Sequence, residues 1–380
     1  MKKRSSYIIA LVIGLIFLGL GIIFSSNSDL AELASTTINR YYLFFVSYTT
    51  SLFPFSLFEI LFIICLIALI IIIIFLLIYI FKKQGKKFLR LLLNTVLILF
   101  IIVGLYAFIT SPVYNRKPTD LPSYEENLSE EEIEEIARFY LTDYASLAAR
   151  ISRDEEGLVK MADYFDFEGL ARKMQEEYSR LYSSYYSSYT PLLKPLINSW
   201  LLTEMNTTGI TFSLTGEANV NVSIPAIDIP FTCAHELAHT KGVMREDDAN
   251  LLALYICLTS DNDFIRYSGY FRAYSRILSA VYYSCSIDTY REIALLLPDI
   301  VKQEISAYHQ YFEAHNTLNK IQDWYNNLYL KINGVKTGID SYNDKENATD
   351  SGDVREDGSI IYNVEFSSYQ KLLFALYYES

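Results

Sequence analysis

Residues 235–239 read HELAH, and this stretch decides what kind of domain surrounds it. In a helix, His235 and His239 are four residues apart, so both imidazoles project from the same face. Two such nitrogens can supply half of a tetrahedral zinc shell. Glu236 follows the first histidine directly, where it can take a proton from a zinc-activated water.

The pattern H-E-x-x-H is the sequence signature of zinc metallopeptidases. The chain has only four histidines, and two of them lie in this pattern. A solvated amphipathic helix with two incidental histidines is the alternative interpretation. The pattern favours an enzyme that holds one zinc ion per chain and hydrolyses peptide bonds, with Glu236 as the general base.

A third zinc ligand is expected shortly after the motif, because zinc with only two protein ligands binds weakly. Gly242 is a good helix terminator, and a second helix is expected to open with EDDAN at 246–250. Its first turn carries Glu246, Asp247 and Asp248. All three could simply complement the helix dipole, or one of them could be the third ligand.

The segment from 209 to 270 resembles a known family. It contains GEANVN, IPF, HELAH and EDDAN, followed by RYSGY at 266–270. These motifs resemble an uncharacterised bacterial family of membrane-anchored, zinc-metallopeptidase-like proteins that is grouped as a domain of unknown function, DUF3810. The resemblance covers about residues 90–380 and implies a membrane anchor joined to a metallopeptidase-like domain.

The HELAH helix and the E-x-x-A-N opening of the next helix also resemble, more distantly, the gluzincin peptidases. In those peptidases the first glutamate of the second motif is the third ligand, which implies Glu246 as ligand and Asn250 in a supporting position. Only six residues separate His239 from Glu246, whereas many gluzincins have a longer spacer. The metzincin pattern would instead place the ligand at Arg245, which cannot bind zinc. The resemblance therefore favours Glu246 over the two aspartates that follow it.

A peptidase also needs a hydrogen-bond donor for the oxyanion of the tetrahedral intermediate. The candidates are Tyr267, Tyr270 and His309. Because the chain has 32 tyrosines, any one of them is more often a core residue than a donor.

Three stretches of the N-terminal third, residues 7–25, 60–81 and 91–110, are almost entirely apolar. Each is long enough to cross about 30 Å of hydrocarbon as a helix. None has the polar stripe of a buried core helix. The first has a basic start but no A-x-A-like cleavage site after it, so an uncleaved anchor is expected rather than a secretory signal.

These features predict a chain in three parts. Residues 1–111 form a membrane anchor with three transmembrane helices, residues 112–128 a linker, and residues 129–380 a zincin-like α+β domain. The domain is expected to be mainly α-helical with a small β element. That element is placed at residues 209–229, which alternate and are rich in Thr, Val and Ile.

Positive charge orients the spans. Residues 82–90, between the second and third spans, contain five basic side chains, and three more precede the first span. The loop between the first and second spans contains only Arg40. The positive-inside rule therefore predicts a multi-pass protein of the cell membrane with a cytoplasmic N-terminus. Residues 112–380 then lie outside the cytoplasm.

The charge balance changes after the third span. Residues 1–111 hold 9 basic and 3 acidic side chains, whereas residues 112–380 hold 23 basic and 41 acidic ones. Such an acidic domain does not suit nucleic acid or an anionic lipid surface. The expected partners are the lipid bilayer and a peptide or protein substrate, with no nucleic acid.

Two alternative functions are compatible with parts of the sequence. A non-catalytic extracytoplasmic binding or structural protein could have kept a metallopeptidase fold, but the intact His-Glu-His favours an enzyme, because loss of Glu236 alone would end activity. An intramembrane protease is less favoured, because HELAHTKGVMREDDAN at 235–250 is too polar for a membrane span.

The predicted topology can be tested with introduced cysteines. Residues 342–358 are polar and acidic and are expected to be a disordered or mobile insertion on the outer domain. A cysteine placed there should react with a membrane-impermeant thiol reagent on intact cells, whereas one placed in 82–90 should react only after lysis. The reverse result would overturn the orientation.

Overall fold

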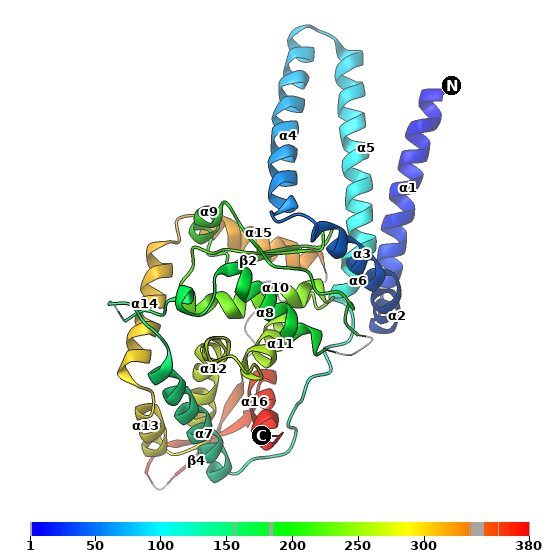
Figure 1. Cartoon of the computed structure of the whole chain (residues 1–380). Helices are drawn as coiled ribbons and strands as arrows, with labels where there is room; N and C mark the ends of the chain where they lie inside the picture. The colour runs from blue at the N-terminus through cyan, green and yellow to red at the C-terminus, as the bar shows by residue number, and fades with distance from the viewer. Residues whose placement is uncertain are drawn as a thin grey trace.

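Figure 1 shows the computed structural model of the chain, in which three long helices stand on a mainly helical domain. The structure describes residues 2–155, 157–181, 185–333, 335, 346–355 and 357–379.

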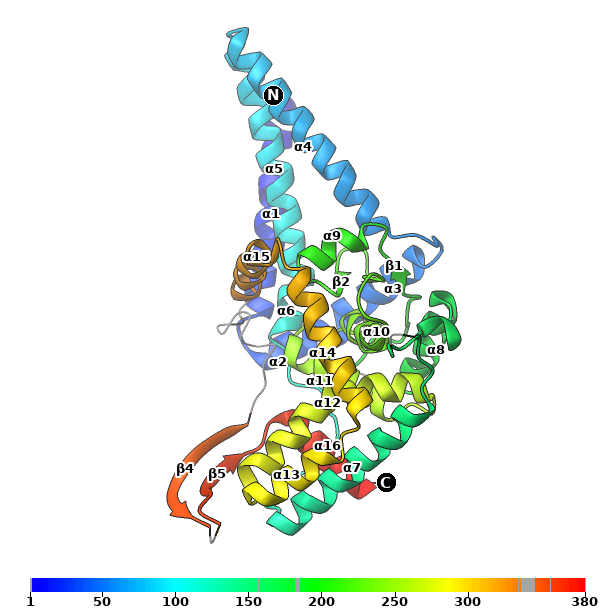
Figure 2. The same ribbon diagram turned by 90° about the vertical axis from the view of Figure 1, so that its left-hand side faces the viewer.

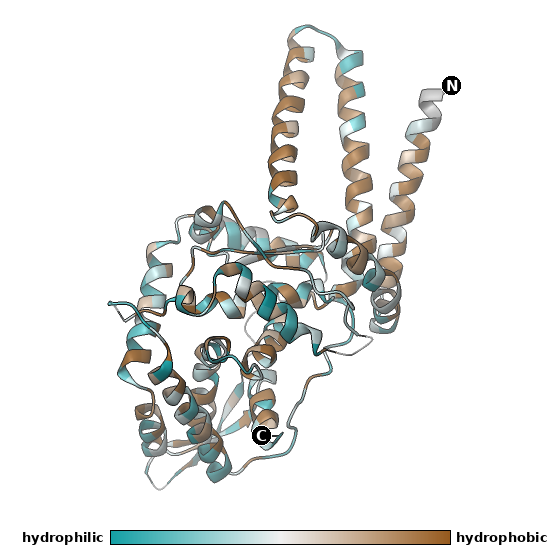
Figure 3. Cartoon of the chain, viewed as in Figure 1, coloured by the Kyte–Doolittle hydropathy of each residue, from teal (hydrophilic) through white to brown (hydrophobic). Residues whose placement is uncertain are grey.

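Three helices of the described chain are long and apolar enough to cross a membrane: α1 (Lys2–Phe24), α4 (Leu57–Phe81) and α5 (Gly85–Ile109). They confirm the three predicted apolar helices, and in Figure 3 their ribbons are coloured mostly as hydrophobic residues. The third begins at Gly85 rather than at 91, so most of the basic segment 82–90 is helical. The N-terminus and the α4–α5 connection lie at the end away from the domain (Figure 1).

The helices α1 and α5 pack closely because glycines remove side chains at their contact. A Cβ on Gly104 would lie 2.8 Å from the carbonyl oxygen of Gly14. A Cβ on Gly21 would lie 2.6 Å from the carbonyl oxygen of Ala107. Small residues at these positions let two helix backbones approach, which is the usual means of packing between apolar helices in lipid.

The remaining elements complete the fold. Short helical segments follow α1 and α5: α2 (Ser28–Ala34), a π-helical turn (Ser35–Asn39), α3 (Arg40–Thr50) and α6 (Ser111–Tyr114). The domain helices are α7 (Glu130–Arg150), α8 (Phe167–Ser179), α9 (Ser199–Glu204), α10 (Ile229–Thr240), α11 (Glu246–Leu258), α12 (Asp263–Ser284), α13 (Ile287–Leu295), α14 (Asp299–Ala314), α15 (Asn319–Ile332) and α16 (Ser368–Glu379), with 3-10 turns at Met161–Asp163 and Ala226–Asp228.

A small sheet contains the strands β1 (Lys194–Pro195), β2 (Gly209–Phe212) and β3 (Glu217–Val220), in the order β1-β3-β2. The strands β2 and β3 form an antiparallel hairpin, with Ile210 opposite Asn219. The predicted β element is therefore present, although the strands end at Val220 rather than extending to 229. The strand β2 forms one edge of this sheet.

The core of the domain lies where α7, α10, α11 and α12 pack together. Aromatic side chains fill much of it, and Tyr144, Tyr178 and Tyr267 are fully buried. The helix α7 starts at a capping box, in which Ser129 Oγ accepts from the Glu132 N–H and Glu132 Oε2 accepts from the Ser129 N–H.

The predicted disorder at 342–358 is wrong for much of that stretch. Residues 342–345 and 356 lie outside the described residues, but Asn347–Val354 forms β4, which pairs antiparallel with β5 (Ile360–Glu365). Figure 2 shows this hairpin at the end of the domain away from the spans. Backbone N–H and C=O groups make the ladder, so a polar sequence with few apolar side chains can still form it.

The predicted linker is docked where it begins. Pro112, Val113 and Tyr114 of α6 are buried. The Arg116 guanidinium donates to both carboxylate oxygens of Glu32, at 2.7 and 3.1 Å, and to the carbonyl of Gly242 at 3.0 Å. Residues 117–128 have no regular secondary structure. The anchor and the domain are thus tied together within the first residues after α5.

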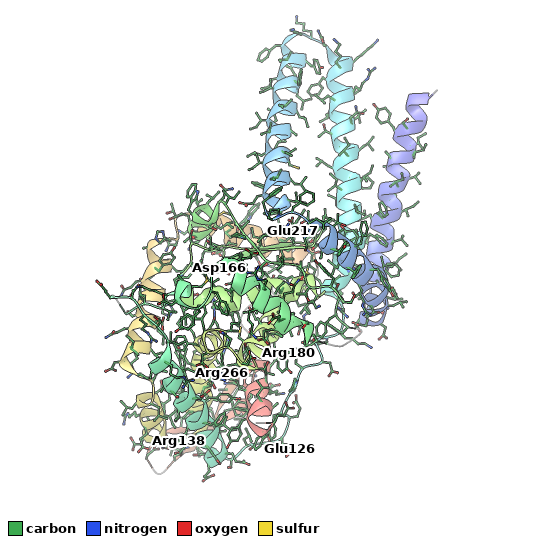
Figure 4. All side chains as sticks on the ribbon, viewed as in Figure 1. Glu126, Arg138, Asp166, Arg180, Glu217 and Arg266 are labelled. Atoms are coloured by element: carbon green, nitrogen blue, oxygen red, sulfur yellow. The ribbon has the colours of Figure 1, made fainter. Side chains whose placement is uncertain are left out.

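A buried carboxylate on β3 joins α4 to the sheet. Glu217 accepts from the backbone N–H groups of Leu57 and Phe58 at the start of α4, both at 2.9 Å. The ammonium group of Lys194 on β1 also donates to it, and both side chains are buried. Figure 4 labels Glu217 at the base of the spans.

Replacement of this carboxylate should destabilise the fold. Glu217→Gln leaves Lys194 buried without its counter-ion, which should cost about 3–5 kcal/mol of unfolding free energy. Denaturant unfolding of the purified full chain in detergent would measure the change. The control is Glu168→Gln, which breaks an exposed pair with Arg172 and should cost less than about 1 kcal/mol. Equal losses in both variants would contradict the role given to Glu217.

Candidate metal centre

The HELAH residues lie on α10, which is buried on nearly every side. The helix packs against β2 and β3 on one side and against α11 and α12 on the other. Small and apolar side chains, including Cys233, Ala234, Leu237 and Ala238, are fully buried there. Polar side chains at such a position need partners, since burying a charged group without one is unfavourable.

The predicted helix end brings a carbonyl back to the second histidine. Gly242 has a φ of +89°, a conformation that glycine adopts without strain. The chain turns there, and the carbonyl oxygen of Val243 lies 2.7 Å from Nδ1 of His239. In the neutral ring, which is the form that binds a metal ion, Nδ1–H donates to this carbonyl and the lone pair of Nε2 is directed to the other side of the ring.

Three side chains converge at that side. The Nε2 atoms of His235 and His239 are 3.1 Å apart. Oε2 of Glu246, the first residue of α11, lies 3.2 Å from Nε2 of His235 and 3.6 Å from Nε2 of His239. The two neighbouring helices α10 and α11 thus supply the three atoms of one cluster.

The cluster fits a tetrahedral zinc ion. Bonds of 2.0–2.1 Å in a tetrahedral shell separate ligand atoms by about 3.3 Å, close to the three separations in the cluster. Two imidazole nitrogens and one carboxylate oxygen are also a donor set that zinc accepts. The candidate ligands His235, His239 and Glu246 are brought together in one place.

Electrostatics keep the carboxylate charged. Burial disfavours the charged forms of His239 and of Glu246. The neighbouring Glu246 carboxylate nevertheless raises the pKa of His239 to about 9. In turn, the two histidines hold the pKa of Glu246 below its usual range despite its burial. Glu246 is therefore a carboxylate at neutral pH, which is the form that binds a metal ion.

The other two acidic residues of the EDDAN stretch face an arginine instead. The Arg245 guanidinium pairs with Asp247 at 2.5 Å and lies 3.6 Å from Oδ2 of Asp248. Burial raises the pKa of Asp248 to about 6. Of the three candidate carboxylates, only Glu246 joins the histidines.

Glu236 lies on the sheet side of α10 and is buried. The Thr211 hydroxyl donates to its Oε2 at 2.7 Å. A Cβ built on Gly209 would lie 2.4 Å from its Oε1, so the carboxylate occupies space that only a glycine leaves open. Burial raises the pKa of Glu236, and the charges of His235 and His239 oppose this rise. Glu236 thus lies within electrostatic reach of both histidines and against the edge strand β2.

The remaining candidates are the possible oxyanion donors and the possible supporting residue. The single hydroxyl protons of Tyr267 and Tyr270 are used in bonds to Glu304 (2.6 Å) and Asp143 (2.7 Å), so neither has a proton to give to an oxyanion. His309 is exposed on α14. Asn250 lies one helical turn after Glu246 on α11, on the same face.

Three residues near the cluster were not predicted from the sequence. Gly209 and Thr211 contact Glu236 from β2; a glycine that opens an alternating stretch is a signal of close backbone approach. Tyr329 on α15 has its pKa raised mainly by burial, and the Glu246 charge adds to the rise. No local pattern links α15 to the motif, so only the tertiary structure reveals Tyr329.

The chain was compared with known families, curated proteins and solved structures. A family model described as "Protein of unknown function (DUF3810)" matches residues 35–345. No curated protein and no solved structure matches.

Metal content separates the three candidate carboxylates. We expect purified protein to hold one zinc ion per chain and Glu246→Gln to lower that content sharply, because it removes one of three converging donors. Asp248→Asn, two residues away on the same helix, should leave zinc content unchanged. Metal analysis by mass spectrometry after dialysis would decide. Loss of zinc in Asp248→Asn but not in Glu246→Gln would show that the third ligand is misassigned.

Proposed function

The chain belongs to the DUF3810 family of proteins of unknown function, and we propose that it is a membrane-anchored, zinc-dependent metallopeptidase. One observation carries the proposal. The ligand atoms of His235, His239 and Glu246 lie 3.1–3.6 Å apart, beside the buried carboxylate of Glu236. A general base next to three converging metal ligands is an arrangement that supports metal-assisted amide hydrolysis.

Each side chain has one role in this mechanism. His235, His239 and Glu246 would hold the ion, and zinc, when bound, polarises a water molecule and lowers its pKa to near neutrality. Glu236 accepts the proton of the attacking water and passes it to the leaving amide nitrogen. The Thr211 hydroxyl bonds to Oε2 of Glu236, which orients the carboxylate.

The edge strand β2 offers a place for an extended peptide. The carbonyls of Thr208 and Phe212 accept from Asn221 and Gly216, so even-numbered residues of β2 bond toward β3. The N–H and C=O groups of the odd residues Gly209 and Thr211 therefore point away from β3, to the free side of the strand. A substrate that pairs there as an added strand passes directly beside Glu236.

Several features support a zincin-like domain facing outward. The helix α10 packs beneath the sheet, β2 is an edge strand, and the next helix supplies Glu246. The domain lies at the end of the spans opposite the N-terminus and the α4–α5 connection, both of which carry basic residues. Under the positive-inside rule this arrangement supports a position of the domain outside the cytoplasm.

The mechanism predicts that Glu236→Gln separates metal binding from hydrolysis. The amide fills the same space but cannot accept a proton, so cleavage of a peptide library should fall by at least about a hundredfold. Zinc content and thermal stability should stay close to those of the wild type. Equal hydrolysis by both proteins would show that the measured activity comes from another site.

Gly209→Ala tests the position of the same carboxylate. The added methyl group must displace the Glu236 carboxylate, and misplacement of a catalytic group by about 1 Å can cost about a hundredfold in rate. The control is Gly85→Ala, because a Cβ at Gly85 meets nothing within 4 Å. Failure of the wild-type chain to cleave any member of a broad library with zinc present would favour a non-catalytic binding protein instead.

A further inference from the structure

The only two tryptophans of the chain are both exposed. Trp200 on α9 is 65% exposed and Trp324 on α15 is 68% exposed. The two residues are far apart in the sequence and lie on different helices. Tryptophan is concentrated at the boundary between lipid and water, where its ring is apolar and its N–H can still reach a polar group.

The helix α9 is fixed at the start of the span α4. The carboxylate of Glu59, in the first turn of α4, accepts from the backbone N–H groups of Ile197 and Asn198 at 2.9 and 3.0 Å. The side-chain amide of Asn198 donates to the same carboxylate at 3.0 Å. Trp200 therefore lies at the level where α4 leaves the domain, as Figure 2 shows for α9.

The helix α15 is fixed at the end of the span α5. The side-chain amide of Asn333, which follows α15 directly, donates to the Tyr106 hydroxyl at 3.1 Å, and Ser111 donates to its carbonyl oxygen at 3.3 Å. The Tyr114 hydroxyl bonds to that of Tyr329 at 3.0 Å. Figure 2 shows α15 beside the lower part of α5.

Both helices carry apolar side chains on the exposed side. On α15, Trp324, Leu328 and Ile332 are exposed and spaced by four residues, so they form one stripe along the helix. On α9 the buried side chains are Ser199 and Thr203, which are polar. This is the reverse of a helix at a water-facing surface, whose apolar side faces the protein.

The helix α3, at the base of the three long helices, also carries apolar side chains on its exposed face. Its buried face carries Leu43 together with the polar residues Ser47 and Thr50. The hydroxyls of Ser47 and Thr50 donate to the carbonyls of Gly216 and Thr215 at 2.8 and 3.1 Å. Its exposed face is a stripe of large apolar and aromatic side chains at helical spacing, which continues just past the helix end: Tyr41, Phe44, Phe45, Tyr48 and Leu52. Figure 1 places α3 at the base of the spans.

We propose that α3, α9 and α15 lie in the headgroup region of the bilayer and seat the domain on the membrane surface. The occupant of their apolar faces is lipid, because all three helices surround the points where α1, α4 and α5 meet the domain (Figures 1 and 2). Amphipathic helices that bury an apolar face at the membrane boundary bind in this way. The proposal does not depend on the proposed peptidase activity.

One consequence concerns the sheet. The turn between β2 and β3 is bonded to α3 through Ser47 and Thr50. Seating α3 in the headgroup layer therefore fixes the distance of the sheet, and of the edge strand β2, from the lipid.

Intrinsic fluorescence tests the proposal, since the chain has only two tryptophans. The full chain is reconstituted in phosphatidylcholine vesicles, and Trp200→Phe and Trp324→Phe each leave one fluorophore. Lipid brominated near the top of its acyl chains should quench each remaining tryptophan at least about twofold, and lipid brominated near the chain ends should quench less. Aqueous iodide should quench both weakly.

The matched control places a tryptophan at the far end of the domain. Leu295 at the end of α13 is 76% exposed, and Leu295→Trp in a background without Trp200 and Trp324 should respond to iodide and not to brominated lipid. If either native tryptophan behaves like this control, it lies in water and the proposal is overturned. Circular dichroism and thermal unfolding of each variant, measured in parallel with the wild-type chain, check that the substitutions leave the fold intact.

Discussion

The buried carboxylate of Glu217 connects the apolar helix α4 to the sheet beside the candidate metal centre. It accepts from the backbone N–H groups at the start of α4 and from the ammonium of Lys194 on β1, so it gives two backbone donors a partner and a buried cation its counter-ion. Glu217 pairs with Phe212 across the hairpin. The first turn of the apolar helix α4 and the edge strand beside Glu236 are therefore held by one residue.

A second carboxylate makes this connection reciprocal. Glu59 of α4 binds the backbone ahead of α9, while Glu217 of the sheet binds the backbone at the start of α4. Bonds from ionised oxygens to backbone N–H groups are among the stronger hydrogen bonds in proteins. With Arg116 bound to Glu32 and Gly242, they give the anchor defined contacts with the sheet and with the end of α10. The domain is therefore attached to the three apolar helices by specific hydrogen bonds and not only by the connecting chain.

The candidate metal centre likewise contains buried charged side chains that need partners. The helix α10 carries two histidines and a glutamate into a region otherwise filled by alanine, leucine and cysteine. Glu246 and His239 stabilise each other's charged forms, and Thr211 supplies a donor to Glu236. Gly209 contributes by having no side chain, since any Cβ there would occupy the place of the Glu236 carboxylate. The polar cluster and the strand above it are therefore mutually dependent.

The sequence by itself determined the features that depend on local periodicity and chemistry. The three apolar helices, the capping box at Ser129, the turn at Gly242 and the shared face of His235 and His239 follow from residues close together in the chain. The β4 strand was missed because its ladder is made by the backbone and leaves little trace in a polar sequence. Only the tertiary structure decided that Glu246, and not Asp247 or Asp248, turns to the histidines, because that depends on Arg245 occupying the two aspartates. It also decided that Tyr267 and Tyr270 bond to distant carboxylates, that Gly209 and Thr211 meet Glu236, and that α3, α9 and α15 gather around the spans. Most of these contacts join residues far apart in the chain, and the geometry of all of them is set by packing that no local pattern specifies.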